Sequence, residues 1–154
     1  MGTMDVNLEV VTIPVSDVDR ALEFYRDRLG WRLDADIKVS DDVRIVQLTP
    51  TGDGHTSIAF GKGLPIAAAP GSMRHLELVT SDVVATREEL AQRGVDVTEV
   101  YHGPGGAFWP EARQPGPDPE RNSYNSFASF QDPDGNGWTL QEVTTRMPGR
   151  EARS

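Results

Sequence analysis

The sequence predicts an α+β fold in which residues 1–154 form a single domain of two β-α-β-β-β modules. An internal repeat is the first observation: residues 10–18 align with residues 75–83 at a constant offset of 65, and Ser-Asp-Val falls on Ser-Asp-Val. Each copy begins with a run of β-branched and aliphatic residues typical of a strand, then reaches a serine or aspartate that can cap a helix. Strand-like stretches follow each helix, so the pattern of strand, helix and strands occurs twice.

Module one covers about residues 8–60. After its first strand, a helix is predicted at residues 18–29, and Gly30 ends it. The apolar residues of this helix recur at spacings of three and four: Val18, Ala21, Leu22, Tyr25 and Leu29. Further strands are expected at residues 31–39, 43–49 and 56–60. Residues 61–72, which are small and include two prolines, form the expected linker to module two.

Module two covers about residues 74–143. Its helix is predicted at residues 83–93 and ends at Gly94, and its later strands are expected at 95–101, 126–131 and 137–143. The sequence Asp-Pro-Asp-Gly-Asn at 132–136 predicts a hairpin connector, because proline fixes φ and glycine tolerates a positive φ. Residues 144–154 show no apolar pattern, and this tail is expected to be mobile.

Module two also contains an insertion at residues 102–125 that module one lacks. Nine of the seventeen residues from Gly103 to Pro119 are glycine or proline, so regular structure is not expected there. Long irregular segments inside a compact domain are commonly functional lids or disordered linkers. The insertion carries Phe108, Trp109 and Tyr124, and large aromatic side chains have little reason to lie in a solvated linker. We therefore expect a lid that packs over a cavity.

Composition excludes several classes of function. The formal net charge of −9 disfavours binding to nucleic acid or to an anionic membrane surface. No apolar run is long enough to span a bilayer, and the N-terminus lacks a basic segment followed by an apolar one, so a cytoplasmic protein is expected. Cysteine is absent, which removes thiolate nucleophiles and thiolate metal ligands. The three histidines are His55, His75 and His102, and His55 lies in a predicted surface turn.

Several of these features together resemble the vicinal oxygen chelate superfamily, the group of glyoxalase I, bleomycin-resistance proteins and extradiol dioxygenases. The resemblance covers about residues 8–143. It rests on the repeated module, Ser-Asp-Val before each helix, Phe24-Tyr25 in the first helix and Asp-Pro-Asp-Gly-Asn before the last strand. It implies an open, cup-shaped mixed sheet, a homodimer, and small-molecule sites in the cups. Metal-dependent members hold one divalent ion with side chains on the first and last strands of each module.

In this sequence the four family ligand positions fall on Val10, Ala59, His75 and Thr139. Three of the four side chains are not metal ligands, whereas a divalent site usually needs three protein donors. No metal cofactor is therefore expected. A displaced site is the alternative, since Glu77 and Gln141 are expected to point into the same cup as His75 and Thr139.

The alternation of strand side chains predicts a polar cluster in the cup: His75, Glu77, Thr12, Thr139 and Gln141. A carboxylate beside an imidazole raises the pKa of the imidazole, so His75 and Glu77 are the candidate acid and base. The structural alternative is a hydrogen-bonded His75 and a solvated Glu77. From the insertion, His102, Trp109 and Tyr124 are candidate ligand contacts. Arg113 and Arg121 can pair with an anionic group, although no spacing requires it.

The first interpretation of function is a metal-independent isomerase, cyclase or lyase that acts on a small carbonyl or aromatic compound. A non-catalytic protein that sequesters a drug or metabolite, like the bleomycin-resistance members, is the alternative. A metal-dependent lyase or dioxygenase with a displaced ligand set is the third possibility. An aromatic-lined cavity in which His75 and Glu77 are turned away or used in structural bonds would favour sequestration, and the class of enzyme stays open.

Overall fold

The computed structural model describes residue 2 and residues 4–151, and it confirms the predicted α+β fold with two open mixed sheets. The chain divides into two compact units. Unit 1 contains Met1–Met73 and Pro133–Asn136, and unit 2 contains Arg74–Asp132 and Gly137–Ser154. In the described part of the chain, no helix is long and apolar enough to cross a membrane.

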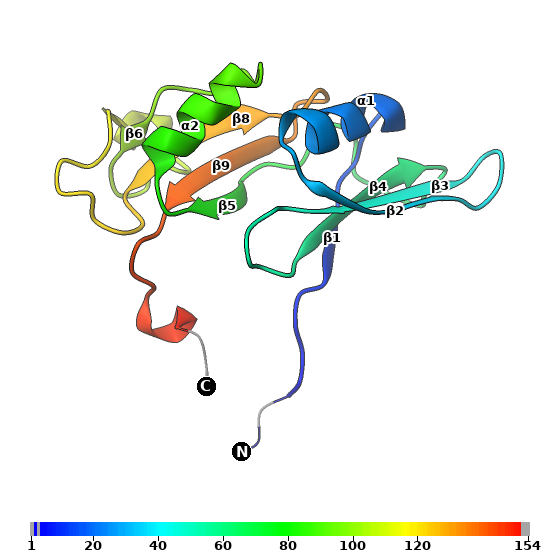
Figure 1. Ribbon diagram of the computed structural model, residues 1–154, viewed down its shortest axis with the longest axis horizontal. Coiled ribbons are helices and arrows are strands. Elements are labelled where there is room, and N and C mark those ends of the chain that lie inside the picture. The colour runs from blue at the N-terminus through cyan, green and yellow to red at the C-terminus, as the bar shows by residue number, and fades with distance from the viewer. Residues whose placement is uncertain (1, 3, 152–154) are drawn as a thin grey trace. The chain divides into compact units, whose positions relative to one another are not determined.

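Unit 1 is a four-stranded sheet in the order β1 (Val10–Thr12), β4 (Ser57–Lys62), β3 (Arg44–Thr49) and β2 (Arg32–Lys38). Strand β1 is parallel to β4, and the other pairs are antiparallel. Helix α1 (Val18–Leu22) continues as a π-helical segment, Glu23–Arg28, and covers one face of the sheet (Figure 1). The Asp17 carboxylate accepts the Arg20 N–H at 3.0 Å, and Gly30 ends the helical segment with φ +74°. Both helix boundaries follow the signals in the sequence.

The core of unit 1 lies between this helical segment and the sheet. Val46, Leu48 and Phe60 are fully buried on the strands. The Tyr25 ring lies 5.3 Å from that of Trp31 and 5.8 Å from that of Phe60, centroid to centroid. Burial of such large side chains stabilises the unit by about 1.5 to 3 kcal/mol per residue.

Unit 2 is a five-stranded sheet in the order β5 (Leu76–Thr80), β9 (Gly137–Glu142), β8 (Ser126–Gln131), β6 (Tyr101–His102) and β7 (Gln114–Pro115). Helix α2 (Val83–Gln92) lies across one face of this sheet and contacts β8 and β9 (Figure 1). The Asp82 carboxylate caps α2 by accepting the Ala85 N–H at 3.1 Å, and Gly94 follows the helix with φ +83°. Short 3-10 turns also occur at Pro110–Ala112 and Pro148–Arg150.

The strand predicted at residues 95–101 is wrong over most of its length. Only Tyr101–His102 forms a strand, and residues 95–100 contribute one isolated bridge, between Val97 and Phe130. The register against β8 shifts by one residue between this bridge and the Tyr101–Phe127 pair. An extra residue therefore interrupts the ladder, as in a β-bulge. The Arg87 Nε also donates to the Thr98 carbonyl at 3.1 Å, so this carbonyl is used by a side chain instead of a neighbouring strand.

The Asp-Pro-Asp-Gly-Asn turn is structural, as the sequence predicted, and Gly135 has φ +98°. Within unit 1, the Asp134 carboxylate accepts the Ser16 N–H at 3.0 Å and pairs with Arg20 at 3.2 Å. The fully buried Asn136 donates its side-chain amide to the Pro14 carbonyl at 2.9 Å. These bonds explain why residues 133–136 belong to unit 1 although they connect two strands of unit 2.

Candidate ligand-binding site

The side of the unit 2 sheet that faces away from α2 is the open face. The Thr80 hydroxyl bonds to that of Thr86 on α2 at 2.7 Å, and the Glu142 carboxylate accepts the Val83 N–H at 3.1 Å, so Thr80 and Glu142 point toward the helix. Side chains alternate along a strand. The open face is thus formed by the intervening, cross-strand paired residues Tyr101, Phe127, Ser129, Thr139, Gln141 and Glu77.

Two aromatic rings form the floor of the open face. The rings of Tyr101 and Phe127 are stacked with centroids 5.6 Å apart, and both are buried together with Ala107 of the insertion. The Tyr101 hydroxyl bonds to the Ser129 hydroxyl at 2.5 Å, which satisfies the polar end of the ring. The first half of the insertion, residues 103–113, therefore packs directly on these two rings through Ala107 and Arg113, and its role as a lid over a cavity stays a prediction.

Arg113 extends this packing. Its guanidinium carbon lies 4.2 Å from the centroid of the Tyr101 ring, a cation–π arrangement, and its Nε donates to the Gly106 carbonyl at 2.8 Å. A Cβ at Gly106 would lie 3.7 Å from the Tyr101 ring and 3.5 Å from Arg113 Cγ, so this backbone packs closely on both side chains.

A cavity of about 610 Å³ opens beside these groups. Its volume lies within the range of about 300 to 1,000 Å³ typical of small-molecule sites. Members of its lining that bear on binding are His75, Ala107, Arg113, Ser129 and Thr139. A larger cavity of about 950 Å³ lies in unit 1, but there Arg44 is tied to Asp36 at 2.8 Å and to Asp19 at 2.7 Å. Because its lining combines Arg113 with the aromatic residues His75, Phe130 and Trp138, the cavity of unit 2 is the candidate ligand site.

His75 does not lie in the strand that the sequence predicted to contain it. Its φ is +60°, a conformation uncommon for residues other than glycine, and β5 begins one residue later at Leu76. The alternation that placed His75 and Glu77 side by side is thereby broken. The His75 ring packs on the Phe108 ring, with centroids 4.8 Å apart. In the described chain no hydrogen bond or ion pair joins His75 to Glu77, which is exposed beside Thr139.

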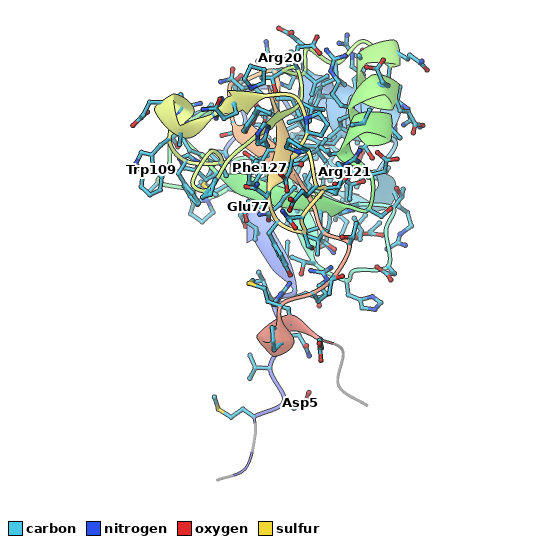
Figure 2. All side chains as sticks on the ribbon, turned by 90° about the vertical axis from the view of Figure 1, so that its left-hand side faces the viewer. Asp5, Arg20, Glu77, Trp109, Arg121 and Phe127 are labelled. Atoms are coloured by element: carbon cyan, nitrogen blue, oxygen red, sulfur yellow. The ribbon has the colours of Figure 1, made fainter. Side chains whose placement is uncertain are left out.

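The structure brings only some of the other predicted site residues to the cavity. Thr139 lines it and is buried. Trp109 is exposed, with its ring 5.9 Å from that of Phe108, and lies on the outer side of the insertion in Figure 2. Thr12 lies in unit 1, next to Ala59. His102 follows Tyr101 on β6, so its side chain points away from the open face, and its Nδ1 bonds to the Gly116 carbonyl at 2.7 Å.

Gln141 and Tyr124 are engaged in bonds that hold the second half of the insertion, residues 117–125. The Gln141 amide donates to the Tyr124 carbonyl at 3.1 Å, and the Tyr124 hydroxyl accepts the Met147 N–H at 3.1 Å. In this half Arg121 reaches Glu142, which is only 1% exposed, with an Nε–Oε2 distance of 2.9 Å. The hydrogen bond from Arg121 lowers the pKa of Glu142 below its ordinary value, and burial opposes this shift.

The role of Glu142 was missed at the level of the sequence. A usable signal existed, because strand alternation places residue 142 on the same side as the core residues Trp138 and Leu140. A carboxylate at such a position requires a buried partner. Which residue supplies it depends on the path of the insertion, which no local pattern encodes.

The residues present do not fit the divalent metal of the metal-dependent relatives. Val10 and Ala59 carry no donor atom. Among the described residues, no group of three or more histidine, aspartate or glutamate side chains is placed to hold a metal ion. The displaced set of His75, Glu77 and Gln141 is also not assembled, because His75 packs on Phe108 and the Gln141 amide bonds to Tyr124.

The two open sheets and the repeated module are those of the vicinal oxygen chelate class. The model of the Glyoxalase/Bleomycin resistance protein/Dioxygenase superfamily matches residues 7–140, and the chain belongs to this family. A comparison with curated proteins gives no match.

Solved structures support the same assignment. TnmS3, an antibiotic binding protein from Streptomyces sp. CB03234, is 30% identical with a TM-score of 0.67, over 92% of this chain and 100% of that chain. A glyoxalase/bleomycin resistance protein from the same organism is 31% identical with a TM-score of 0.63, over 88% and 100%. The trypanothione-dependent glyoxalase I of Leishmania major is 18% identical with a TM-score of 0.56, over 90% and 87%, and shares the fold.

Proposed function

We propose that the protein binds a small planar aromatic compound on the open face of unit 2 and does not convert it chemically. The observation that carries this proposal is that His75 lines the cavity and that its ring packs on the Phe108 ring. An imidazole packed on an aromatic ring and separate from Glu77 is placed as part of an apolar wall. It is not placed as one half of an acid–base pair.

The similarity to TnmS3 supports this proposal, since that relative is described as an antibiotic binding protein. An aromatic antibiotic or metabolite matches a wall of this kind, because offset stacking and burial of ring surface both favour planar ligands. The proposal reverses the order of the two leading interpretations drawn from the sequence.

Titration with N-phenyl-1-naphthylamine, an uncharged planar fluorophore, tests the proposal. We expect saturable binding, and recovery of the probe unchanged by liquid chromatography and mass spectrometry. Phe108→Ala should weaken binding about tenfold, because the ring on which His75 packs is lost. Val84→Ala is the matched control, since Val84 is an exposed apolar residue on α2, across the sheet from the open face. Absence of binding by the wild-type protein would refute the proposal.

A metal-independent acid–base enzyme is the second candidate, and the conformation of His75 favours it. A non-glycine residue held at φ +60° beside a cavity is the kind of backbone strain found at functional sites. His75→Asn separates the two candidates, because asparagine tolerates the left-handed region. The binding proposal expects the variant to bind the probe several times more weakly, because the His75 ring is lost, and expects no turnover by the wild type or by the variant. Turnover of a small carbonyl compound by the wild type, lost in this variant, would establish the enzyme instead.

We also propose that the protein functions without a metal ion, as a cytoplasmic homodimer. The composition of the four family positions supports the first part. Elemental analysis of the purified protein checks it, and a stoichiometric transition metal would contradict it. Light scattering coupled to size-exclusion chromatography checks the dimer.

A further inference from the structure

We infer that the ligand of the unit 2 cavity carries an acidic group and that Arg113 binds this group. The inference rests on the proposed function and adds the chemical class of the ligand, a planar aromatic carboxylate, phenolate or sulfonate. No motif in the sequence assigns a role to Arg113.

The charge environment of Arg113 is unusual for this protein. With a net charge of −9, carboxylates are in excess, and most of the other arginines in the described residues form ion pairs with them. Arg44 contacts Asp36 and Asp19, and Arg121 contacts Glu142. Within the described residues, Arg113 takes part in no ion pair, although it is half-buried. A half-buried cation that is left without a carboxylate is a natural partner for an anion from outside the chain.

The guanidinium is also held in one orientation. Its Nε is used by the Gly106 carbonyl, and its carbon lies over the Tyr101 ring, which favours a cation at that place. These contacts do not use the two terminal nitrogens of the Arg113 guanidinium. Together these nitrogens can bind two oxygens of a carboxylate or sulfonate through parallel hydrogen bonds. Because the side chain is ordered before a ligand arrives, less conformational entropy is lost on binding.

The other residues that line the cavity can contact the aromatic part of such a ligand. Besides Arg113, the lining includes the aromatic residues His75, Phe130 and Trp138, and the His75 ring packs on that of Phe108. Two carboxylates, Asp96 and Asp132, also line the cavity. Asp96 is exposed to water and Asp132 is only 5% exposed, and neither forms an ion pair with Arg113. These carboxylates do not neutralise the arginine through direct contact.

A pair of probes with one aromatic scaffold tests the inference. N-phenyl-1-naphthylamine is uncharged, and 1-anilinonaphthalene-8-sulfonate adds one sulfonate to the same ring system. We expect the wild type to bind the sulfonate about tenfold more tightly, a preference that weakens with salt. Arg113→Gln should remove this preference, with the affinity for the uncharged probe within about twofold. Arg113→Lys should keep part of it, because the charge remains while the planar fork is lost.

Arg146→Gln is the control, because it removes the same charge from an exposed arginine in the tail, and it should leave the preference intact. Thermal melts followed by circular dichroism confirm that each variant is folded. Equal binding of both probes by the wild type overturns the inference and leaves the proposed function standing. Loss of both affinities in a folded Arg113→Gln also overturns it, because the residue would then act only through packing. If neither probe binds, the proposed function itself fails.

Discussion

The two halves of the insertion differ in what holds them, although both contain prolines and each carries one arginine. In the second half, Arg121 pairs with the buried Glu142 and reaches Asp82 at the start of α2. In the first half, Arg113 rests on the Tyr101 ring and a backbone carbonyl. An arginine thus forms a structural ion pair in the second half and lines a cavity in the first half. The carboxylates within reach decide which of these roles it takes.

The two halves of the insertion also differ in which residues adopt a positive φ. Arg121 and Tyr124 have φ of +52° and +72°, which costs of order 1 kcal/mol or more for a residue with a side chain. The Arg121 N–H donates to the Asp118 carbonyl at 2.8 Å, and the Tyr124 N–H donates to the Glu142 carbonyl at 2.8 Å, so specific bonds offset this strain. In the first half the positive φ values fall on Gly103 and Gly105, where they cost little. Figure 2 shows Trp109 and Arg121 on opposite sides of Phe127.

The largest effect is expected from breaking the bond of the second half. Glu142→Gln removes the charge that Arg121 and the Val83 N–H bind, and we expect a loss of about 2 to 4 kcal/mol in the free energy of unfolding. Urea denaturation measures it. Glu77→Gln is the matched control, since it makes the same change at an exposed carboxylate of the same sheet, and its effect should stay within about 0.5 kcal/mol. Equal effects of the two variants would mean that the Arg121 pair contributes nothing.

The pH dependence of stability should sharpen the same contrast. Because the pKa of Glu142 is lower in the folded state than its ordinary value of 4.5, its contribution is fully present above that value and is lost as the pH falls through the folded pKa. The difference in unfolding free energy between wild type and Glu142→Gln should therefore shrink as the pH is lowered below 4.5. Denaturation curves between neutral and acidic pH measure it. A difference independent of pH would contradict this assignment.

A smaller effect is expected from two glycines that share a backbone conformation. Gly105 has φ +79° and Gly116 has φ +80°, so alanine at either position should cost about 1 kcal/mol of stability. Only at Gly105 would the new Cβ meet a side chain, at 2.9 Å from Trp109 Cε3, whereas nothing lies within 4 Å at Gly116. Gly105→Ala should therefore also change the tryptophan emission. An equal change in Gly116→Ala would argue against a role for the position of Trp109.

Much of the fold was predictable because its signals are local. Asp17 and Asp82 cap the two helices as their positions before apolar repeats indicated, and Gly30 and Gly94 end them. The strand Ser126–Gln131 has the predicted bounds. The strand predicted at residues 95–100 does not form for a physical reason. A strand exists only where its partner matches it in register, and the one-residue shift against β8 depends on both paired segments.

The candidate site was predictable only in part. Strand alternation correctly placed Glu77, Thr139 and Gln141 on one face. It failed for His75, because a single left-handed residue before β5 turned that side chain toward Phe108. Whether Thr12, Trp109, Tyr124 and the other predicted contacts bind a ligand stays a prediction.

By itself, the sequence determined the repeated module, the family and the helix boundaries, because these depend on residue order, apolar spacing and capping within a few residues. It also determined that two of the family's four metal positions carry no donor. Only the tertiary structure decided that Arg121 holds the insertion while Arg113 lines the cavity, and that the His75 ring packs on Phe108. The physical reason is that ion pairs, ring contacts and burial join residues far apart in the chain, and their energies depend on distances that no local pattern specifies.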